Sequence, residues 1–133
     1  MIKAMVRVMA EKNNRRTGAE SEFYAVQFLR EKNYSILKTN FRVGRLGEID
    51  IIARNEEYIC FIEVKSRRSD TFGTPGEAVT PSKQKKIRQL ASVYLANSNY
   101  ANSFIRFDVI EIILSEQGGT NEIKSINLIK NAF

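Results

Sequence analysis

Histidine is missing from all 133 residues, and Cys60 is the only cysteine. The first absence excludes Ser-His and Cys-His catalytic pairs, histidine general bases and histidine-ligated zinc. The second excludes an internal disulfide and any multi-cysteine metal site, and it fits a reducing cytoplasm. Within its apolar run, Cys60 is expected to be a small core hydrophobe. Hydrolytic chemistry in this chain must therefore use carboxylates, lysine and an oxygen-preferring metal ion.

Long apolar runs, internal repeats and low-complexity tracts are also lacking. We expect residues 1–16 to be a basic N-terminal extension without a signal peptide or a membrane span. Residues 17–133 are expected to form one domain, because this length suits a single core of a sheet and two helices. The 21 basic residues outnumber the 15 acidic ones and give a net charge of +6. Such a charge favours a polyanionic partner, most commonly nucleic acid.

Two strand-like apolar runs, residues 47–53 and 58–65, carry three acids and a lysine. Charges inside strands are costly unless they are paired, solvated or metal-bound, so the cluster marks a candidate functional site. If Glu56 and Glu57 form a two-residue turn, residues whose numbers sum to 113 lie opposite each other. The charged residues then share one face of the hairpin as two opposed pairs, Asp50 with Glu63 and Glu48 with Lys65. The alternation of side chains sends the apolar residues to the other face: Ile49, Ile51, Ile62 and Val64.

Two interpretations of the charged face remain open. In the first, the pairs are ordinary cross-strand ion pairs on a solvated face, each worth a few tenths to about 1 kcal/mol. In the second, a Mg²⁺ or Mn²⁺ ion relieves the repulsion between Asp50 and Glu63, with the carbonyl of Val64 as a third ligand. Lys65 would then lie near the metal-bound water and a phosphate, which suits phosphodiester hydrolysis.

Thr17 and Glu20 form a capping-box pattern that predicts a helix continuing to about Lys32. Its inward stripe contains Ala25, Val26 and Leu29, and Glu22 falls on the same stripe. Glu22 therefore either points toward the body of the protein or is a partly solvated acid that the helix dipole favours.

The remaining pattern predicts an α/β fold with a mixed five-stranded sheet flanked by helices. Strands are expected over residues 35–41, 104–114 and 122–129 in addition to the acidic hairpin, with a turn at Gly118-Gly119 and a loop over 66–79. Thr80 is a good N-cap, and Pro81 suits the first position of a helix. This helix has an apolar stripe made of Ile87, Leu90, Ala91, Tyr94 and Leu95. Because the helix lies between the third and fourth strands, it permits a parallel crossover.

Several polar residues surround the acidic hairpin in the sequence. Gln84 lies one turn before Ile87 on the inward face of its helix. A basic set is expected either to bind phosphates that flank a scissile bond or to be a solvated charged face: Arg67, Arg68, Lys83, Lys85, Lys86 and Arg88. Arg106 and Asp108 lie two apart on one strand, so we expect a structural salt bridge in preference to a role in the site. Phe72 is expected to pack on the sheet, although it could stack on a base.

These residues resemble known motifs. Asp50 followed by Glu63-Val64-Lys65 is similar to the PD-(D/E)XK nuclease motif. The wider string resembles the YraN family of endonuclease-like bacterial proteins, which are themselves similar to archaeal Holliday-junction resolvases. The matching pieces cover roughly residues 17–112: Gly18 with Glu22 and Ala25, Asn40-Phe41-Arg42, residues 47–53, residues 61–67, Phe72-Gly73 with Pro75, Lys83-Gln84, Tyr94-Leu95 and residues 106–109.

The resemblance implies a restriction-endonuclease-like core and a magnesium- or manganese-dependent endonuclease that acts on DNA, with branched or structured DNA as the leading substrate. It implies the following roles: Glu22 as a helix acid near the metal, Asp50 and Glu63 as metal ligands, Lys65 as the catalytic lysine and Gln84 as a polar residue facing the site. Ser21 replaces a glycine that is usual in the family, and its small size preserves close packing.

Two other functions are weighed against the nuclease. One is a nucleic-acid-binding module with the same fold and no catalysis, and the other is a protein-interaction scaffold. A homodimer would suit a resolvase, because such an enzyme must cut two strands.

Overall fold

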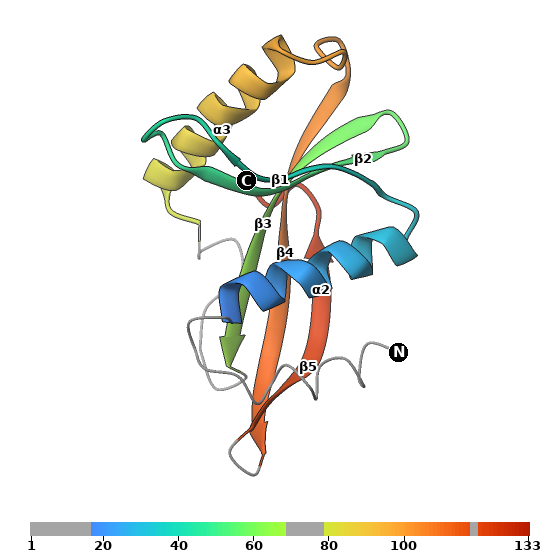
Figure 1. The fold of residues 1–133 in the computed structure, drawn as a ribbon, viewed down its shortest axis with the longest axis vertical. Coiled ribbons are helices and arrows are strands. Elements are labelled where there is room, and N and C mark those ends of the chain that lie inside the picture. Colours follow the sequence, from blue (N-terminus) through green and yellow to red (C-terminus); the bar gives the residue numbers. More distant parts are fainter. Residues whose placement is uncertain (1–16, 69–78, 118–119) are drawn as a thin grey trace.

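The computed structural model describes residues 17–68, 79–117 and 120–133 (Figure 1). The expected N-terminal extension, Phe72 and the Gly118-Gly119 turn lie outside the described residues. The elements follow the predicted order: α2 (Thr17–Glu31), β1 (Ser35–Arg42), β2 (Glu48–Asn55), β3 (Tyr58–Arg68), α3 (Pro81–Ala96), β4 (Phe104–Gln117) and β5 (Thr120–Ile129). None of the helices in this part of the chain is long and apolar enough to cross a membrane.

The five strands form one mixed sheet in the order β1-β2-β3-β4-β5. Neighbouring strands are antiparallel, with the exception of β3 and β4, which are parallel and are connected through α3. A parallel pair needs such a crossover, and the position of α3 in the sequence supplies it. The predicted α/β fold is therefore confirmed, and it is consistent with a restriction-endonuclease-like core.

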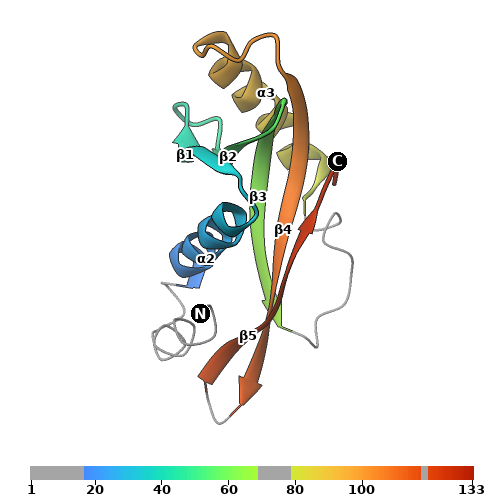
Figure 2. The same cartoon turned by 90° about the vertical axis from the view of Figure 1, so that its right-hand side faces the viewer.

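The two helices lie on different sides of the sheet (Figure 2). The first hydrophobic cluster, the α3-side core, joins α3 to the sheet through Ile49, Ile52, Ile59, Phe61, Ile87, Leu90, Ala91, Phe107 and Val109. The second, the α2-side core, joins α2 to the sheet through Ala25, Leu29, Ile51, Ala53, Cys60, Ile62, Ile110 and Ile112. Both predicted helix stripes pack inward as expected, and Cys60 is fully buried among apolar neighbours.

The start of α3 follows the predicted capping pattern. Thr80 is the N-cap, its Oγ1 accepts a hydrogen bond from the backbone N–H of Lys83 at 3.2 Å, and Pro81 opens the helix. This cap satisfies one of the unpaired N–H groups at the helix start and fixes where the first turn lies.

Strands β3 and β4 each run three residues past their predicted ends. Residues 66–68 were expected to open a loop, but they continue β3 and pair with residues 112–114 of β4. Strand β4 in turn runs to Gln117, where it pairs with Thr120. The polar composition of residues 66–68 and 115–117 conceals these extensions, because pairing between backbones does not depend on apolar side chains.

The acidic hairpin has the predicted register. Glu56 and Glu57 form the turn, and the paired residues, from Asn55 with Tyr58 to Ile51 with Ile62, all sum to 113. The predicted division of side chains is wrong at one residue: Ile49 packs in the α3-side core, whereas Ile51 packs in the α2-side core. Alternation is therefore interrupted at Asp50, one residue beyond the last pair of β2 and β3.

The turn gives a test of this register. Glu56 has a φ of 55°, in the left-handed region that costs a non-glycine residue about 1 kcal/mol. We expect Glu56→Gly to unfold at a higher urea concentration than the matched variant Glu57→Gly, with free energies of unfolding about 1 kcal/mol apart. Equal effects of the two substitutions would contradict this assignment of the turn.

Candidate functional site

The candidate site begins where β2 and β3 part. Regular pairing of the two strands ends at Ile51 and Ile62. Beyond that point the Asp50 carboxylate takes the place of a backbone partner, because its Oδ2 accepts a hydrogen bond from the N–H of Val64 at 2.8 Å. The fork between the strands therefore holds a carboxylate in a fixed position.

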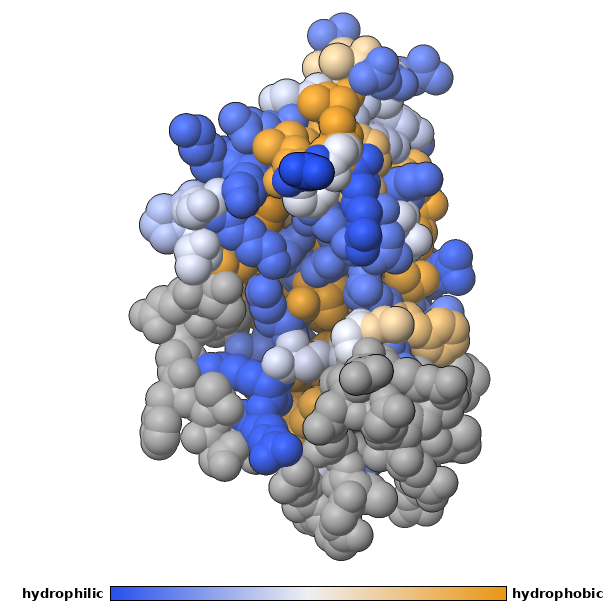
Figure 3. All heavy atoms as spheres, turned by 60° about the vertical axis from the view of Figure 1, so that its left-hand side comes forward, coloured by the Kyte–Doolittle hydropathy of each residue, from blue (hydrophilic) through white to orange (hydrophobic). Residues whose placement is uncertain are grey.

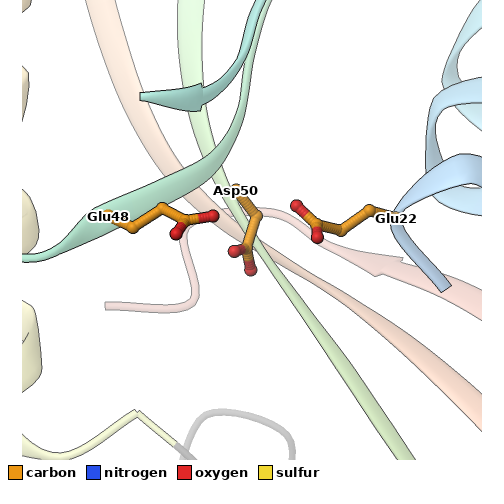
Figure 4. A group of neighbouring side chains, drawn as sticks. All are labelled: Glu22, Glu48 and Asp50. Carbon is orange, nitrogen blue, oxygen red and sulfur yellow. The ribbon is translucent and has the colours of Figure 1, made fainter. Parts of the chain in front are cut away.

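Three carboxylates meet at this fork (Figure 4). Glu22 comes from α2, and Glu48 and Asp50 come from β2; all three are half-buried, and each offers an oxygen within 4.8 Å of the others. The resemblance placed Glu22 near this cluster. Glu48 was instead expected to pair with Lys65, but the structure pairs it with Arg42 at 2.6 Å. The predicted register already set Glu48 on the same face as Asp50, but it did not show that Glu48 joins the carboxylates at the fork.

Glu63 lies next to this group and is almost completely buried, with 1% of its side chain exposed. Its Oε2 forms an ion pair with the Nζ of Lys83 at 2.9 Å. Among the described residues, no hydrogen-bond partner contacts its other oxygen, Oε1. A buried carboxylate oxygen without a partner is costly, so this atom calls for a donor or a cation.

These contacts contradict the interpretation as two cross-strand ion pairs on a solvated face. Glu63 is buried, and its cation comes from α3 and not from β2. The cation that pairs with Glu48 comes from β1. Register alone could not reveal these partners, because both cations belong to segments outside the hairpin.

The fork concentrates negative charge where water has little access, and this raises the pKa values of two of its carboxyl groups. Burial and the neighbouring charges of Glu63 and Glu22 raise the pKa of Asp50 to about 7, although the hydrogen bond from Val64 and the charge of Lys83 act against this. Burial, followed by the charges of Glu48 and Glu63, also raises the pKa of Glu22. Carboxylates in this state bind a proton or a cation readily.

Two lysines lie against the acids. Burial lowers the pKa of Lys65, and the hydrogen bond and the charge of Lys83 lower it further, while Glu63 and Asp50 oppose the change. Burial also acts to lower the pKa of Lys83, but the hydrogen bond and the charge of Glu63, together with the hydrogen bond of Lys65 and the charge of Asp50, outweigh burial and raise it. Lys83 is therefore the firmly protonated member of the pair, and Lys65 releases its proton more easily.

A serine contact connects α2 to β3 beside the site. Ser21 is 7% exposed, and its Oγ lies 2.5 Å from the Oγ of Ser66. These residues precede Glu22 and follow Lys65 in the sequence. The contact therefore fixes the distance between the helix that carries one acid and the strand that carries the lysine.

The other residues singled out in the sequence fall into different places. The side-chain nitrogen of Gln84 donates to the carbonyl of Val79 at 2.9 Å, so the structure directs this group to the start of α3. Arg67 forms an ion pair with buried Glu111 at 2.9 Å. Lys85 and Lys86 are exposed on α3, and the guanidinium of Arg88 lies 4.5 Å from the centre of the Phe107 ring. Arg68 ends β3 and is exposed.

The expected salt bridge between Arg106 and Asp108 is confirmed as a buried structural contact. The Arg106 Nε donates to both carboxylate oxygens of Asp108, at 2.8 and 3.0 Å. The guanidinium also donates to the hydroxyl of Tyr34, and the N–H of Asn131 donates to Asp108. With these partners the pair joins the start of β1 and the end of the chain to the sheet.

A hard divalent cation fits the donors at the fork. Mg²⁺ and Mn²⁺ prefer carboxylate and carbonyl oxygens, and the fork presents oxygens from Glu22, Glu48 and Asp50 close together. Glu63 is not a member of this group of three, but its buried Oε1, which has no partner among the described residues, is a further oxygen beside the fork that a donor or a cation would satisfy. The donor set therefore matches the chemistry of such an ion.

Comparisons with known proteins give the family. A model of the family described as "Uncharacterised protein family UPF0102" matches residues 21–112. A UPF0102 protein from Acetivibrio thermocellus is 52% identical to this chain over 94% of it and 97% of its own length. A UPF0102 protein from Caldicellulosiruptor saccharolyticus is 45% identical over 91% of this chain and 99% of its own length. A UPF0102 protein from Clostridium acetobutylicum is 47% identical over 90% of this chain and 95% of its own length. The chain belongs to the UPF0102 family, the YraN family that its motifs resemble.

The Lys83–Glu63 pair predicts a specific loss of stability. Lys83→Met leaves the buried Glu63 without its cation, and we expect the free energy of unfolding to fall by about 1–3 kcal/mol, less than for a fully buried pair because Lys83 is 40% exposed. Lys86→Met, on the same helix, should change it by less than about 0.5 kcal/mol. Urea denaturation measures both values. If adding Glu63→Gln to Lys83→Met recovers no stability, the loss does not arise from this pair.

The raised pKa of Asp50 predicts how stability depends on pH. An unfolded aspartate titrates near 3.8, whereas Asp50 in the fold titrates near 7. The folded state therefore binds more protons between these values, so this group favours folding at low pH and its contribution is lost as pH rises from about 4 to 7. Asp50→Asn keeps an acceptor for Val64 and cannot titrate. We expect its stability relative to the unsubstituted protein to rise over that interval in metal-free urea titrations; a constant difference would contradict the shift.

Proposed function

We propose that this protein is a metal-dependent endonuclease of the PD-(D/E)XK type that hydrolyses phosphodiester bonds in nucleic acid. The observation that carries the proposal is the group of three carboxylates at the β2–β3 fork, next to two lysines and to buried Glu63, whose Oε1 has no partner among the described residues. A function that uses the negative charge accounts for this arrangement better than a structural role does, because crowding partly buried carboxylates costs the fold stability even when each has a partner. The resemblance of Asp50 and Glu63-Val64-Lys65 to the nuclease motif supports the same reading.

The fork supplies ligands for Mg²⁺ or Mn²⁺. Asp50 and Glu63 are the proposed direct ligands, and the carbonyl of Val64 is the proposed third. Glu22 and Glu48 bring further carboxylates to the same place. When bound, such an ion makes its water a stronger acid and withdraws charge from a phosphate oxygen. The backbone N–H of Val64 holds Asp50 in position for this role.

Lys65 is the proposed catalytic lysine. Its lowered pKa allows the amine to exchange a proton with an attacking water more easily than an ordinary lysine does. In its protonated form, the ammonium also stabilises the negative charge that develops on the phosphate. Lys83 has a raised pKa and stays protonated in its ion pair with Glu63. The two lysines therefore have separate roles: Lys83 neutralises Glu63, and Lys65 acts at the phosphate.

Phosphates that flank the scissile bond are proposed to bind along α3. Its exposed side carries Lys85 and Lys86, and an open hollow of about 410 Å³ is lined by Pro81, Gln84, Lys85, Arg88, Gln89 and Ser92. The side of the molecule on which α3 lies is largely hydrophilic (Figure 3). Basic side chains on such a surface bind the backbone of nucleic acid without reading its sequence. The proposed partner is DNA, with branched or structured DNA as the leading substrate, and a homodimer would suit paired cuts.

Cleavage assays with defined DNA test this function. We expect Mg²⁺ or Mn²⁺ to activate cutting of forked, four-way or linear DNA by the purified protein, and EDTA to abolish it. Asp50→Asn and Lys65→Ala should each lower the cleavage rate by about two orders of magnitude or more, because each removes a charged group from the reacting centre. The folded fraction and the DNA affinity should change little.

The controls separate catalysis from binding. Lys86→Ala, on the exposed side of α3, should weaken DNA binding and its dependence on salt while metal-activated cutting persists. Salt-dependent binding without metal-dependent cutting of any substrate would favour the non-catalytic binding module. Absence of salt-dependent DNA binding would instead favour a protein-interaction scaffold.

A further inference from the structure

Asn40 lies in β1 directly across from the fork. Its neighbours Thr39 and Phe41 pair with Ile51 and Ile49 of β2, so the register sets Asn40 opposite Asp50. It is also one of the few non-glycine residues in the described part of the chain with a left-handed backbone, at a φ of 52°. Residues with this backbone are uncommon inside strands, and they are often found where function constrains the chain.

The side chain of Asn40 explains why glycine does not occupy this position. With its amide nitrogen turned toward the acids, Asn40 donates to Oε1 of Glu48 at 2.5 Å and to Oε1 of Glu22 at 2.8 Å. The opposite orientation would place the amide oxygen against carboxylate oxygens, so hydrogen bonding decides the assignment. Glycine would meet the backbone requirement at lower cost, but it has no donor.

One amide therefore joins two carboxylates that come from different elements. Glu22 belongs to α2 and Glu48 to β2, and like charges at this separation repel each other. Each N–H bond offsets part of that repulsion and restricts the rotation of one carboxylate. The other oxygen of Glu22 stays available, while Oε2 of Glu48 forms the ion pair with Arg42. Outer-shell donors that orient the ligands of a metal have this arrangement.

We propose that Asn40 is a positioning residue that holds Glu22 and Glu48 together for a divalent cation. The inference rests on the proposed metal-dependent function and extends it to a residue outside the nuclease motif. Asn40 acts through the two acids, and its amide needs no contact with the cation or the substrate. The left-handed backbone at Asn40 occurs at the residue whose side chain contacts the acids, which links the local strain to the site.

The test compares two asparagines that have the same backbone conformation. Asn33 follows α2 with a φ of 67°, and Glu22 precedes it by 11 residues. Both substitutions relieve the same backbone strain, but Asn40→Gly also removes two hydrogen bonds to the acids, so without metal its urea midpoint should lie below that of Asn33→Gly. Isothermal titration with Mn²⁺ and Mg²⁺ should show that Asn40→Gly binds the ion at least about tenfold more weakly than the unsubstituted protein. Asn33→Gly should bind it with unchanged affinity.

A second variant, Asn40→Asp, replaces the attractive contact between the amide and the two acids by a repulsive one. It keeps the test valid if Asn40→Gly folds poorly. Asn40→Asp retains a residue that tolerates the left-handed region, but it places a carboxylate between two others. We expect this variant to have a lower melting temperature without metal, and to gain more from saturating Mn²⁺ than the unsubstituted protein does.

The outcomes separate this inference from the proposed function. If the unsubstituted protein and Asn40→Gly bind Mn²⁺ equally, or if Asn40→Asp melts at the original temperature without metal, Asn40 does not position the acids. If the unsubstituted protein binds no divalent cation, the metal-dependent function fails and the inference fails with it. Weaker binding in Asn40→Gly together with a protein that cuts no DNA would retain the inference and overturn the nuclease.

Discussion

Repulsion among desolvated carboxylates is the constraint on which the organisation of this protein depends. Glu22, Glu48 and Asp50 crowd the β2–β3 fork, and buried Glu63 adds a fourth negative charge beside them. Donors from several elements oppose the repulsion: the N–H of Val64, the Lys83 ammonium and the amide of Asn40. Each donor satisfies only part of the charge, so the elevated pKa of Asp50 persists. The fold therefore maintains a site that a divalent cation would stabilise.

The hydrophobic cores explain how such a site can exist in a small domain. The α2-side core and the α3-side core attach a helix to each side of the sheet, and together they hold the strands on both sides of the fork. Burial of these apolar side chains supplies the main favourable free energy of folding, at about 25 cal/mol for each Å² removed from water. Against this background, a local electrostatic cost at the fork can be sustained because it is confined to one end of the β2–β3 pairing.

Local patterns in the sequence were enough to predict the elements and the hairpin register, whereas the partners of the charged residues depend on tertiary structure. Thr80 and Pro81 predict the start of α3, and the turn at Glu56 and Glu57 predicts which residues of β2 and β3 face each other. No local pattern shows that Lys83 reaches Glu63 or that Arg67 reaches Glu111. The packing of Ile49 in the α3-side core was also missed. Strict alternation of side chains assumes that β2 and β3 stay paired past Asp50, and they do not.

The first turn of α3 connects the proposed catalytic centre to the proposed surface for DNA. Lys83 faces inward to Glu63, while Lys85 and Lys86 are exposed only two and three residues further along the helix. The Thr80 cap fixes this turn, and the turn contains no acid that would compete for the lysines. A phosphate backbone that lies along α3 would therefore approach the same helix end that supplies the cation for Glu63. Binding on the surface and charge in the site would then be coupled through one rigid helical turn, since a shift of its backbone moves Lys83 as well as Lys85 and Lys86.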